Sequence, residues 1–174
     1  MRNEYEIRGD TAVIFIRRKD GSTVKTIVSK EDLPRLLSFD VTWCVTRKHT
    51  GRLHVCANVT KNGKKTTIPL HRFLVDCPKG KVVDHINGDT LDNRRQNLRV
   101  VSNAENLQNR QGLNANNSSG VRGVSWDKAR GKWQAKIKVN YKTIHLGRFD
   151  DIEEARKAVE EAICKYMPFA ISSQ

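Results

Sequence analysis

The chain has 174 residues, of which 32 are Lys or Arg and 19 are Asp or Glu, giving a formal net charge of +13. Such an excess of positive charge indicates a polyanionic partner, either nucleic acid or an anionic membrane surface. Hydrophobic residues make up 37% and aromatic residues 6% of the sequence, which favours several small cores over one large core. No apolar run of about 18 residues occurs, which excludes a helical membrane span.

Cysteine usage and the N-terminus indicate the compartment. The N-terminal sequence MRNEYEIRGD lacks the apolar stretch of a secretory signal, so we expect a cytoplasmic protein. No Cys-x-x-Cys pair occurs, and structural zinc sites usually need two such close pairs, so no structural zinc is expected. We expect reduced thiols that serve as small packing residues. The cysteines are Cys44, Cys56, Cys77 and Cys164.

Residues 1–69 are predicted to form a basic, strand-rich region. The apolar stretches TAVIF and STVKTIV flank Asp20-Gly21, a dipeptide typical of hairpin turns, and Asn62-Gly63 predicts a second hairpin. Between the hairpins, Ser29 precedes acidic residues and is predicted to cap a short helix that ends near Leu37. These patterns predict structure but point to no chemistry.

Residues 70–111 follow the order strand, loop, strand, helix. KVVDHI predicts a strand that ends in Asp84 and His85, and the turn-rich loop NGDTLDNRRQ leads to a second strand, LRVV. The following SNAE is a capping box, which predicts the start of a helix. If the strands pair antiparallel and the helix folds back on them, Asn106 in the first helical turn faces Asp84 and His85.

A carboxylate, an imidazole and an amide oxygen suit metal-assisted hydrolysis of a phosphodiester. A hard divalent cation takes oxygen ligands, which Asp84 and Asn106 can supply, and keeps several waters besides the substrate phosphate. Adjacent strand residues point to opposite faces, so His85 would not share the ion with Asp84 on a regular strand. We therefore expect one divalent ion, Mg²⁺ with Mn²⁺ as the alternative, and His85 as the base that activates water.

Several spaced residues of this segment match a known family. They are Asp84-His85, Asn97 within NLR, and Asn106 on the helix. With them the segment resembles the HNH nucleases, the ββα-metal family, and among these the free-standing and intron-encoded homing endonucleases of bacteriophages. The resemblance implies His85 as general base, Asp84 and Asn106 as metal ligands, and Asn97 as the residue that holds the loop and orients His85. Asn106 stands where the family name has its final His, a variant common in the phage subgroup.

Other polar residues near the motif leave alternatives open. His71 could buttress the site or touch phosphate, and a role in packing or helix initiation is equally open. Arg99 could neutralise a phosphate or lie solvated on its strand, and Arg94 is expected to contact the DNA backbone or solvent. Histidines without a carboxylate neighbour are assigned to the surface: His49, His54 and His145.

The uncharged segment 112–119 predicts a linker, and residues 120–174 form a second module. Three strand patterns precede a helix pattern with an apolar stripe. Residues 120–148 carry eight basic side chains and one acidic one, whereas residues 150–166 carry six acidic and three basic ones. The helix is therefore predicted to cover one face of a three-stranded sheet and leave a basic face for the DNA major groove. The predicted stripe is Ile152, Ala155, Val159, Ala162 and Tyr166.

The second module also matches a known family. The matching residues are Arg122-Gly123-Val124, Trp126, Trp133, the run 146–149 and the Ala-rich helix. With them the module resembles the plant ethylene-response-factor (APETALA-type) DNA-binding domain, a three-stranded sheet with one packed helix.

Residue roles follow from this second resemblance. It implies that Arg122 and Trp126 contact DNA, with Lys136 and Lys138 on the groove-facing side and Trp133 in the core. Ser125 stands where plant relatives commonly have Arg, so the base preference is not carried over.

Together these patterns predict an α+β protein with a ββα-metal HNH core and a small three-stranded antiparallel sheet packed on one helix. We expect a metal-dependent, homing-type endonuclease that hydrolyses double-stranded DNA as a monomer, without a protein partner or membrane contact, in the host-cell cytoplasm if a phage encodes it. Two alternatives stay open: a DNA-binding regulator with an inactive HNH core, and a structural RNA- or ribosome-binding protein.

Overall fold

The computed structural model describes residues 1–48, 51–109, 113 and 116–170. The chain divides into two compact units, Met1–Val101 and Ser102–Gln174. Both are built from small sheets and a few helices, so the predicted α+β class is confirmed. Within the described ranges, no helix is long and apolar enough to cross a membrane.

The first unit begins with a four-stranded sheet. Strands β1 (Tyr5–Arg8), β2 (Thr11–Arg17) and β3 (Thr23–Ser29) pair antiparallel in chain order, and the Asp20-Gly21 hairpin is confirmed. The fourth strand, β8 (Asp92–Asn93), comes from the predicted loop of the HNH-like segment and pairs parallel with β3. Through β8, the loop is thus hydrogen-bonded to the N-terminal sheet.

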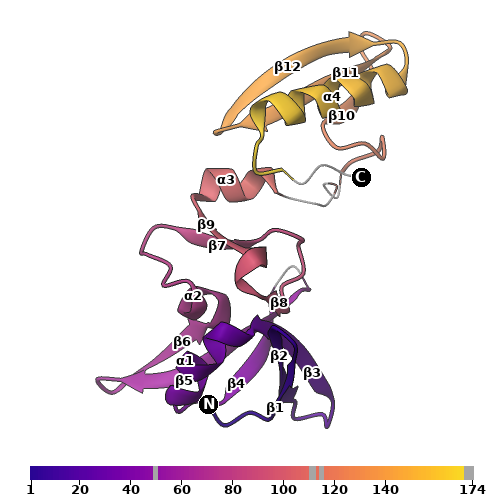
Figure 1. Cartoon of the computed structure of the whole chain (residues 1–174). Helices are drawn as coiled ribbons and strands as arrows, with labels where there is room; N and C mark the ends of the chain where they lie inside the picture. The colour runs from indigo at the N-terminus through magenta and orange to yellow at the C-terminus, as the bar shows by residue number, and fades with distance from the viewer. Residues whose placement is uncertain (49–50, 110–112, 114–115, 171–174) are drawn as a thin grey trace. The chain divides into compact units, whose positions relative to one another are not determined.

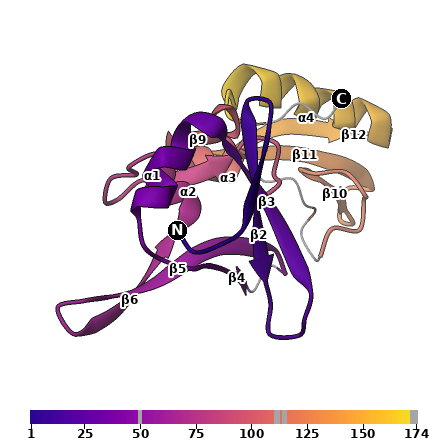
Figure 2. The same ribbon diagram turned by 60° about the horizontal axis from the view of Figure 1, so that its bottom comes forward.

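A second sheet and two short helices complete the support of this unit. Strands β4 (Trp43–Arg47), β5 (Leu53–Lys61) and β6 (Lys64–Pro69) pair antiparallel, and the β5–β6 hairpin at Asn62-Gly63 is confirmed (Figure 2). The helical elements are the 3-10 turn η1 (Lys30–Asp32), α1 (Leu33–Ser38) and α2 (Leu70–Leu74). The largest buried apolar side chains are Ile14, Ile16, Leu36, Trp43, Leu70 and Leu74.

The predicted side-chain cap at Ser29 is wrong. Ser29 does precede η1, but its hydroxyl makes no capping bond. Instead, Ser29 Oγ accepts a hydrogen bond from the backbone N–H of Arg95 at 2.9 Å. The hydroxyl is used to hold the HNH-like loop rather than the helix.

The two strands of the HNH-like segment pair as predicted. Strand β7 (Val82–His85) runs antiparallel to β9 (Leu98–Val101), with a 3-10 turn, η2 (Arg95–Asn97), before β9. Helix α3 (Asn103–Gln108) follows, and its Ser-x-x-Glu capping box is confirmed. Because α3 falls in the second unit and the strands in the first, the compact ββα core stays a prediction.

The second unit carries a three-stranded antiparallel sheet under one long helix. Strands β10 (Val124–Asp127), β11 (Lys132–Val139) and β12 (Lys142–Phe149) pair in chain order, and α4 (Ile152–Tyr166) lies along one face (Figure 1). Ala155, Val159 and Ala162 of the predicted stripe are buried. Tyr166 is 40% exposed, so its core assignment is wrong, and Met167 is buried there instead. The predicted linker lies partly outside the described residues.

Candidate functional site

Three histidines from distant parts of the sequence meet in the first unit. His85 ends β7 and is 6% exposed, while His71 of α2 and His54 of β5 are half-buried. Ring centroids lie 5.3 Å apart for His71 and His85, 6.0 Å for His54 and His71, and 6.4 Å for His54 and His85. The surface role predicted for His54 is therefore wrong, and His71 lies beside the candidate base.

Burial keeps this histidine cluster uncharged at neutral pH. Burial, and after it the neighbouring His85 ring, lower the pKa of His71 to about 3. The pKa values of His54 and His85 are also lowered, chiefly by burial. For His85, the hydrogen bond with Asn93 and the charge of Asp84 partly oppose that shift. A neutral imidazole is the form that can accept a proton.

The second candidate residue, Asp84, is held in an ion pair. It lies directly opposite Arg99 in the β7–β9 hairpin and is 8% exposed. Nε and Nη2 of Arg99 lie 2.8 and 2.6 Å from Asp84 Oδ2. Arg99 is thus paired with Asp84 rather than simply solvated. A cation that binds Asp84 would compete with this guanidinium.

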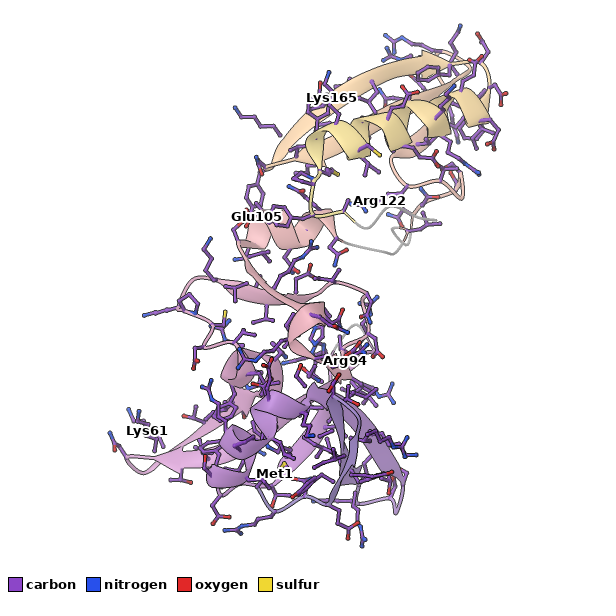
Figure 3. The ribbon with its side chains drawn as sticks, in the orientation of Figure 1. Met1, Lys61, Arg94, Glu105, Arg122 and Lys165 are labelled. Carbon is purple, nitrogen blue, oxygen red and sulfur yellow. The ribbon has the colours of Figure 1, made fainter. Side chains whose placement is uncertain are left out.

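Asn97 ties together two parts of the loop that leads from β7 to β9. Its Oδ1 accepts from the Asn87 backbone N–H at 2.9 Å, and its Nδ2 donates to the Asp92 carbonyl at 2.7 Å. Arg94, labelled in Figure 3, makes a two-pronged ion pair with the Asp92 carboxylate at 2.8 and 2.7 Å. This pair lowers the pKa of Asp92. Arg94 is therefore engaged within the protein and is only partly exposed.

Residues of the N-terminal region hold the same loop through further hydrogen bonds. Arg95 Nε and Nη2 donate to the fully buried Asp32 carboxylate at 2.9 and 2.6 Å. The Thr90 hydroxyl donates to the Leu53 carbonyl at 2.5 Å. Together with the β3–β8 pairing, these bonds make residues 1–69 the scaffold of the candidate site, a role the sequence did not indicate.

The proposed metal ligands agree with a hard cation in their chemistry. Asp84 offers carboxylate oxygen and the half-buried Asn106 of α3 offers amide oxygen, a set that leaves room for waters and a phosphate. The two residues belong to different units, so their pairing stays a prediction. Among the described residues, no group of three or more His, Cys, Asp or Glu is placed to hold a metal ion.

The sheet of the second unit offers one face to solvent. Lys136 and Lys138 are exposed and alternate with Ala135 and Ile137, which are buried with α4. Trp126 is 44% exposed and meets Trp133 edge-on, with ring centroids 4.9 Å apart. The exposed lysines thus lie on the face that α4 does not cover.

Arg122 and Gly123 each have a structural role in this unit. The Arg122 guanidinium (Figure 3) donates to the Gln108 carbonyl at 3.3 Å. Gly123 has φ +82°, and a Cβ there would lie 2.7 Å from the Lys136 carbonyl oxygen, so only glycine fits. The backbone of β11 can therefore approach this turn closely.

Comparisons with known proteins agree with both sites. A family model described as HNH endonuclease matches residues 76–108, and one described as AP2 domain matches residues 119–167. The chain carries an HNH endonuclease domain followed by an AP2 domain. The HNH match contains Asp84, His85 and Asn106, and the AP2 match contains the three-stranded sheet and α4.

One curated relative extends the comparison to phages. The chain is 38% identical over 60 residues to "Protein 3.8" of Escherichia phage T7. The aligned part covers 34% of this chain and 49% of that protein, so the match spans about half the relative's length. No solved structure matches the chain significantly.

Proposed function

We propose that this protein is a metal-dependent, homing-type endonuclease that hydrolyses phosphodiester bonds in double-stranded DNA as a monomer. The observation that carries this proposal is His85, buried, uncharged at neutral pH and next to Asp84, within the HNH match. The basic face of the AP2 sheet supports duplex DNA as the substrate, because a sheet of this size fits the major groove.

His85 is proposed as the general base. Its neutral ring takes a proton from water while the water oxygen attacks phosphorus in line with the 3′ oxygen. The new P–O bond forms as the bond from phosphorus to the 3′ oxygen breaks, and the leaving oxygen takes a proton from solvent. The products are a 5′ phosphate and a 3′ hydroxyl. A divalent cation held by Asp84 and Asn106 would neutralise charge on the scissile phosphate and the leaving oxygen.

The remaining site residues are proposed to position and to bind. Asn97 keeps the loop closed around His85 through its two backbone bonds. Arg122, Trp126, Lys136 and Lys138 are proposed as DNA contacts of the AP2 domain. Arg94 and Arg99 would have to leave their carboxylate partners before they could contact DNA phosphates.

The proposal is tested by incubating the full chain with supercoiled phage or plasmid DNA. With Mg²⁺ or Mn²⁺ we expect nicked or linear product that carries 5′ phosphates, and EDTA should abolish it. Binding without cleavage under both metals would instead support a DNA-binding regulator with an inactive HNH core. Preferential binding of RNA in competition with duplex DNA would support the RNA-binding alternative.

A further inference from the structure

We propose that Asn93 and Thr26 fix the tautomer of His85, so that the neutral ring carries its proton on Nε2 and has its lone pair on Nδ1. Asn93 is then a positioning residue that acts through His85, and Thr26 of the N-terminal sheet acts through Asn93. The catalytic consequence rests on the proposed function, but the tautomer itself is a property of the protein alone.

The chain of hydrogen bonds begins at a group that can only accept. The carbonyl oxygen of Leu91 lies 2.7 Å from the hydroxyl of Thr26, so the single hydroxyl proton of Thr26 points to Leu91. Thr26 Oγ1 can then only accept from its other neighbour. That neighbour is Nδ2 of Asn93, at 2.9 Å.

The orientation of the Asn93 amide follows from these contacts. Its Nδ2 also lies 3.4 Å from the carbonyl oxygen of Thr90, which again can only accept. An amide turned the other way would place its oxygen against Thr90 O and against a hydroxyl whose proton is already committed. The NH₂ group therefore faces Thr26 and Thr90, and Oδ1 faces His85.

The orientation of Asn93 determines the tautomer of His85. Asn93 Oδ1 lies 3.3 Å from His85 Nε2 and has no proton to give. The hydrogen bond therefore requires the proton on Nε2, and in the neutral ring the lone pair is then on Nδ1. Nδ1 is the nitrogen that would accept the proton of the attacking water.

Burial keeps water from replacing these bonds. Thr26 is fully buried, Asn93 is 1% exposed and His85 is 6% exposed. An unpaired polar group at such depth costs free energy, so each member holds the next in its orientation. The parallel register of β3 and β8, with Val28 opposite Asn93, brings the Asn93 side chain to Thr26.

The test reads the tautomer directly, by NMR on the ¹⁵N-labelled full chain at about pH 8, where the ring is neutral. The His85 ring signals are identified by their absence from His85→Gln. We expect one tautomer, with Nε2 protonated and its proton slow to exchange with water. A wild-type ring protonated on Nδ1 would overturn the proposal.

Three variants extend the test. Asn93→Leu should lose the protected Nε2 proton and slow DNA cleavage about tenfold, the effect of one hydrogen bond of ordinary strength. Thr26→Val should also speed exchange of that proton and slow cleavage, whereas Thr26→Ser keeps the hydroxyl and should match wild type. If Asn93→Leu fails to fold, the Thr26 pair decides. Wild-type proton exchange and cleavage in Thr26→Val would contradict the proposal.

The two proposals fail in different ways. Wild-type protein that shows the expected tautomer but never cleaves DNA would refute the endonuclease and leave the tautomer assignment standing. Protein that cleaves DNA while Nδ1 carries the proton would refute the tautomer assignment alone.

Discussion

Burial of His71 beside the imidazoles of His54 and His85 links the stability of the protein to pH. The folded pKa of about 3 lies below the ordinary value of 6.5, so between these values the unfolded chain binds the extra proton. Stability should therefore fall as the pH drops through that window. From pH 7 to pH 5 the loss due to His71 should reach up to about 2 kcal/mol.

His71→Gln removes this titration and is the test of the linkage. We expect denaturant unfolding of His71→Gln to show a smaller loss of stability between about pH 7 and pH 5 than wild type does. His145→Gln, at an exposed strand position, serves as the control for the His-to-Gln substitution itself. An unchanged pH dependence in His71→Gln would contradict the buried, uncharged state of this ring.

The ion pair between Arg99 and Asp84 makes a second prediction at the scale of single residues. In Arg99→Gln the buried carboxylate loses this ion pair, so stability without metal should fall by up to about 3 kcal/mol. Because the guanidinium no longer competes, Mn²⁺ should bind more tightly and raise the melting temperature more than in wild type. Calorimetric titration with Mn²⁺ measures the affinity.

Arg95→Gln is the matched control for that experiment, because its partner is Asp32 rather than Asp84. It should destabilise the protein without tightening Mn²⁺ binding. Equal Mn²⁺ affinity in Arg99→Gln and wild type would show that Asp84 does not hold the cation.

The turn between β11 and β12 is strained, because two residues other than glycine adopt positive φ there. Asn140 and Tyr141 have φ of +45° and +65°, the left-handed pair of a tight hairpin turn, and Tyr141 is 64% exposed. Tyr141→Gly should therefore raise the stability of the AP2 domain by about 1 kcal/mol, since little packing is lost. Denaturant unfolding of the full chain checks this.

Asn140→Gly provides the comparison at the neighbouring position. Asparagine tolerates a positive φ better than tyrosine does, so its gain should be smaller. A Tyr141→Gly protein that is less stable than wild type would mean that the exposed ring contributes packing or that the turn differs in solution.

Local signals in the sequence predicted the elements that depend on neighbouring residues. The turns at Asp20-Gly21 and Asn62-Gly63 and the capping box before α3 are confirmed because turn and cap chemistry involves only a few adjacent residues. Strand β8 could not be predicted, because two polar residues have no periodicity and become a strand only by pairing with β3. The same holds for the Ser29 hydroxyl, whose partner is Arg95.

The candidate site was predictable in its residue types and not in its surroundings. Asp84 and His85 could be selected because they end an apolar strand before a turn-rich loop. His54 could not, since it lies in another sheet and meets His85 only through the tertiary fold. The Arg99 partner of Asp84 depends on the register of β7 and β9, which the loop between them determines.

Across the whole molecule, the charge of +13 should make DNA binding strongly dependent on salt. Lys136 is exposed on the AP2 sheet, and Lys136→Ala should weaken binding to all duplexes and reduce the salt slope by about one if it contacts phosphate. A loss confined to particular sequences would indicate that it contacts a base. Fluorescence anisotropy with labelled duplexes over a range of salt concentrations measures both.

Lys157→Ala removes the same charge from the exposed side of α4 and is the matched control. It should change affinity less than Lys136→Ala does, because α4 covers the opposite face of the sheet. Equal effects of the two substitutions would mean that the AP2 domain binds DNA through net charge rather than through its sheet face.

The most direct test of the endonuclease is the single-turnover rate of DNA cleavage by His85→Ala in Mg²⁺, with DNA binding and folding measured on the same sample. Loss of the general base should lower the rate by about two to four orders of magnitude and leave binding intact. With enzyme in excess over DNA, the control variant His145→Ala should retain the wild-type rate. A folded His85→Ala protein that cleaves within about tenfold of wild type would contradict the assignment of His85 as the base.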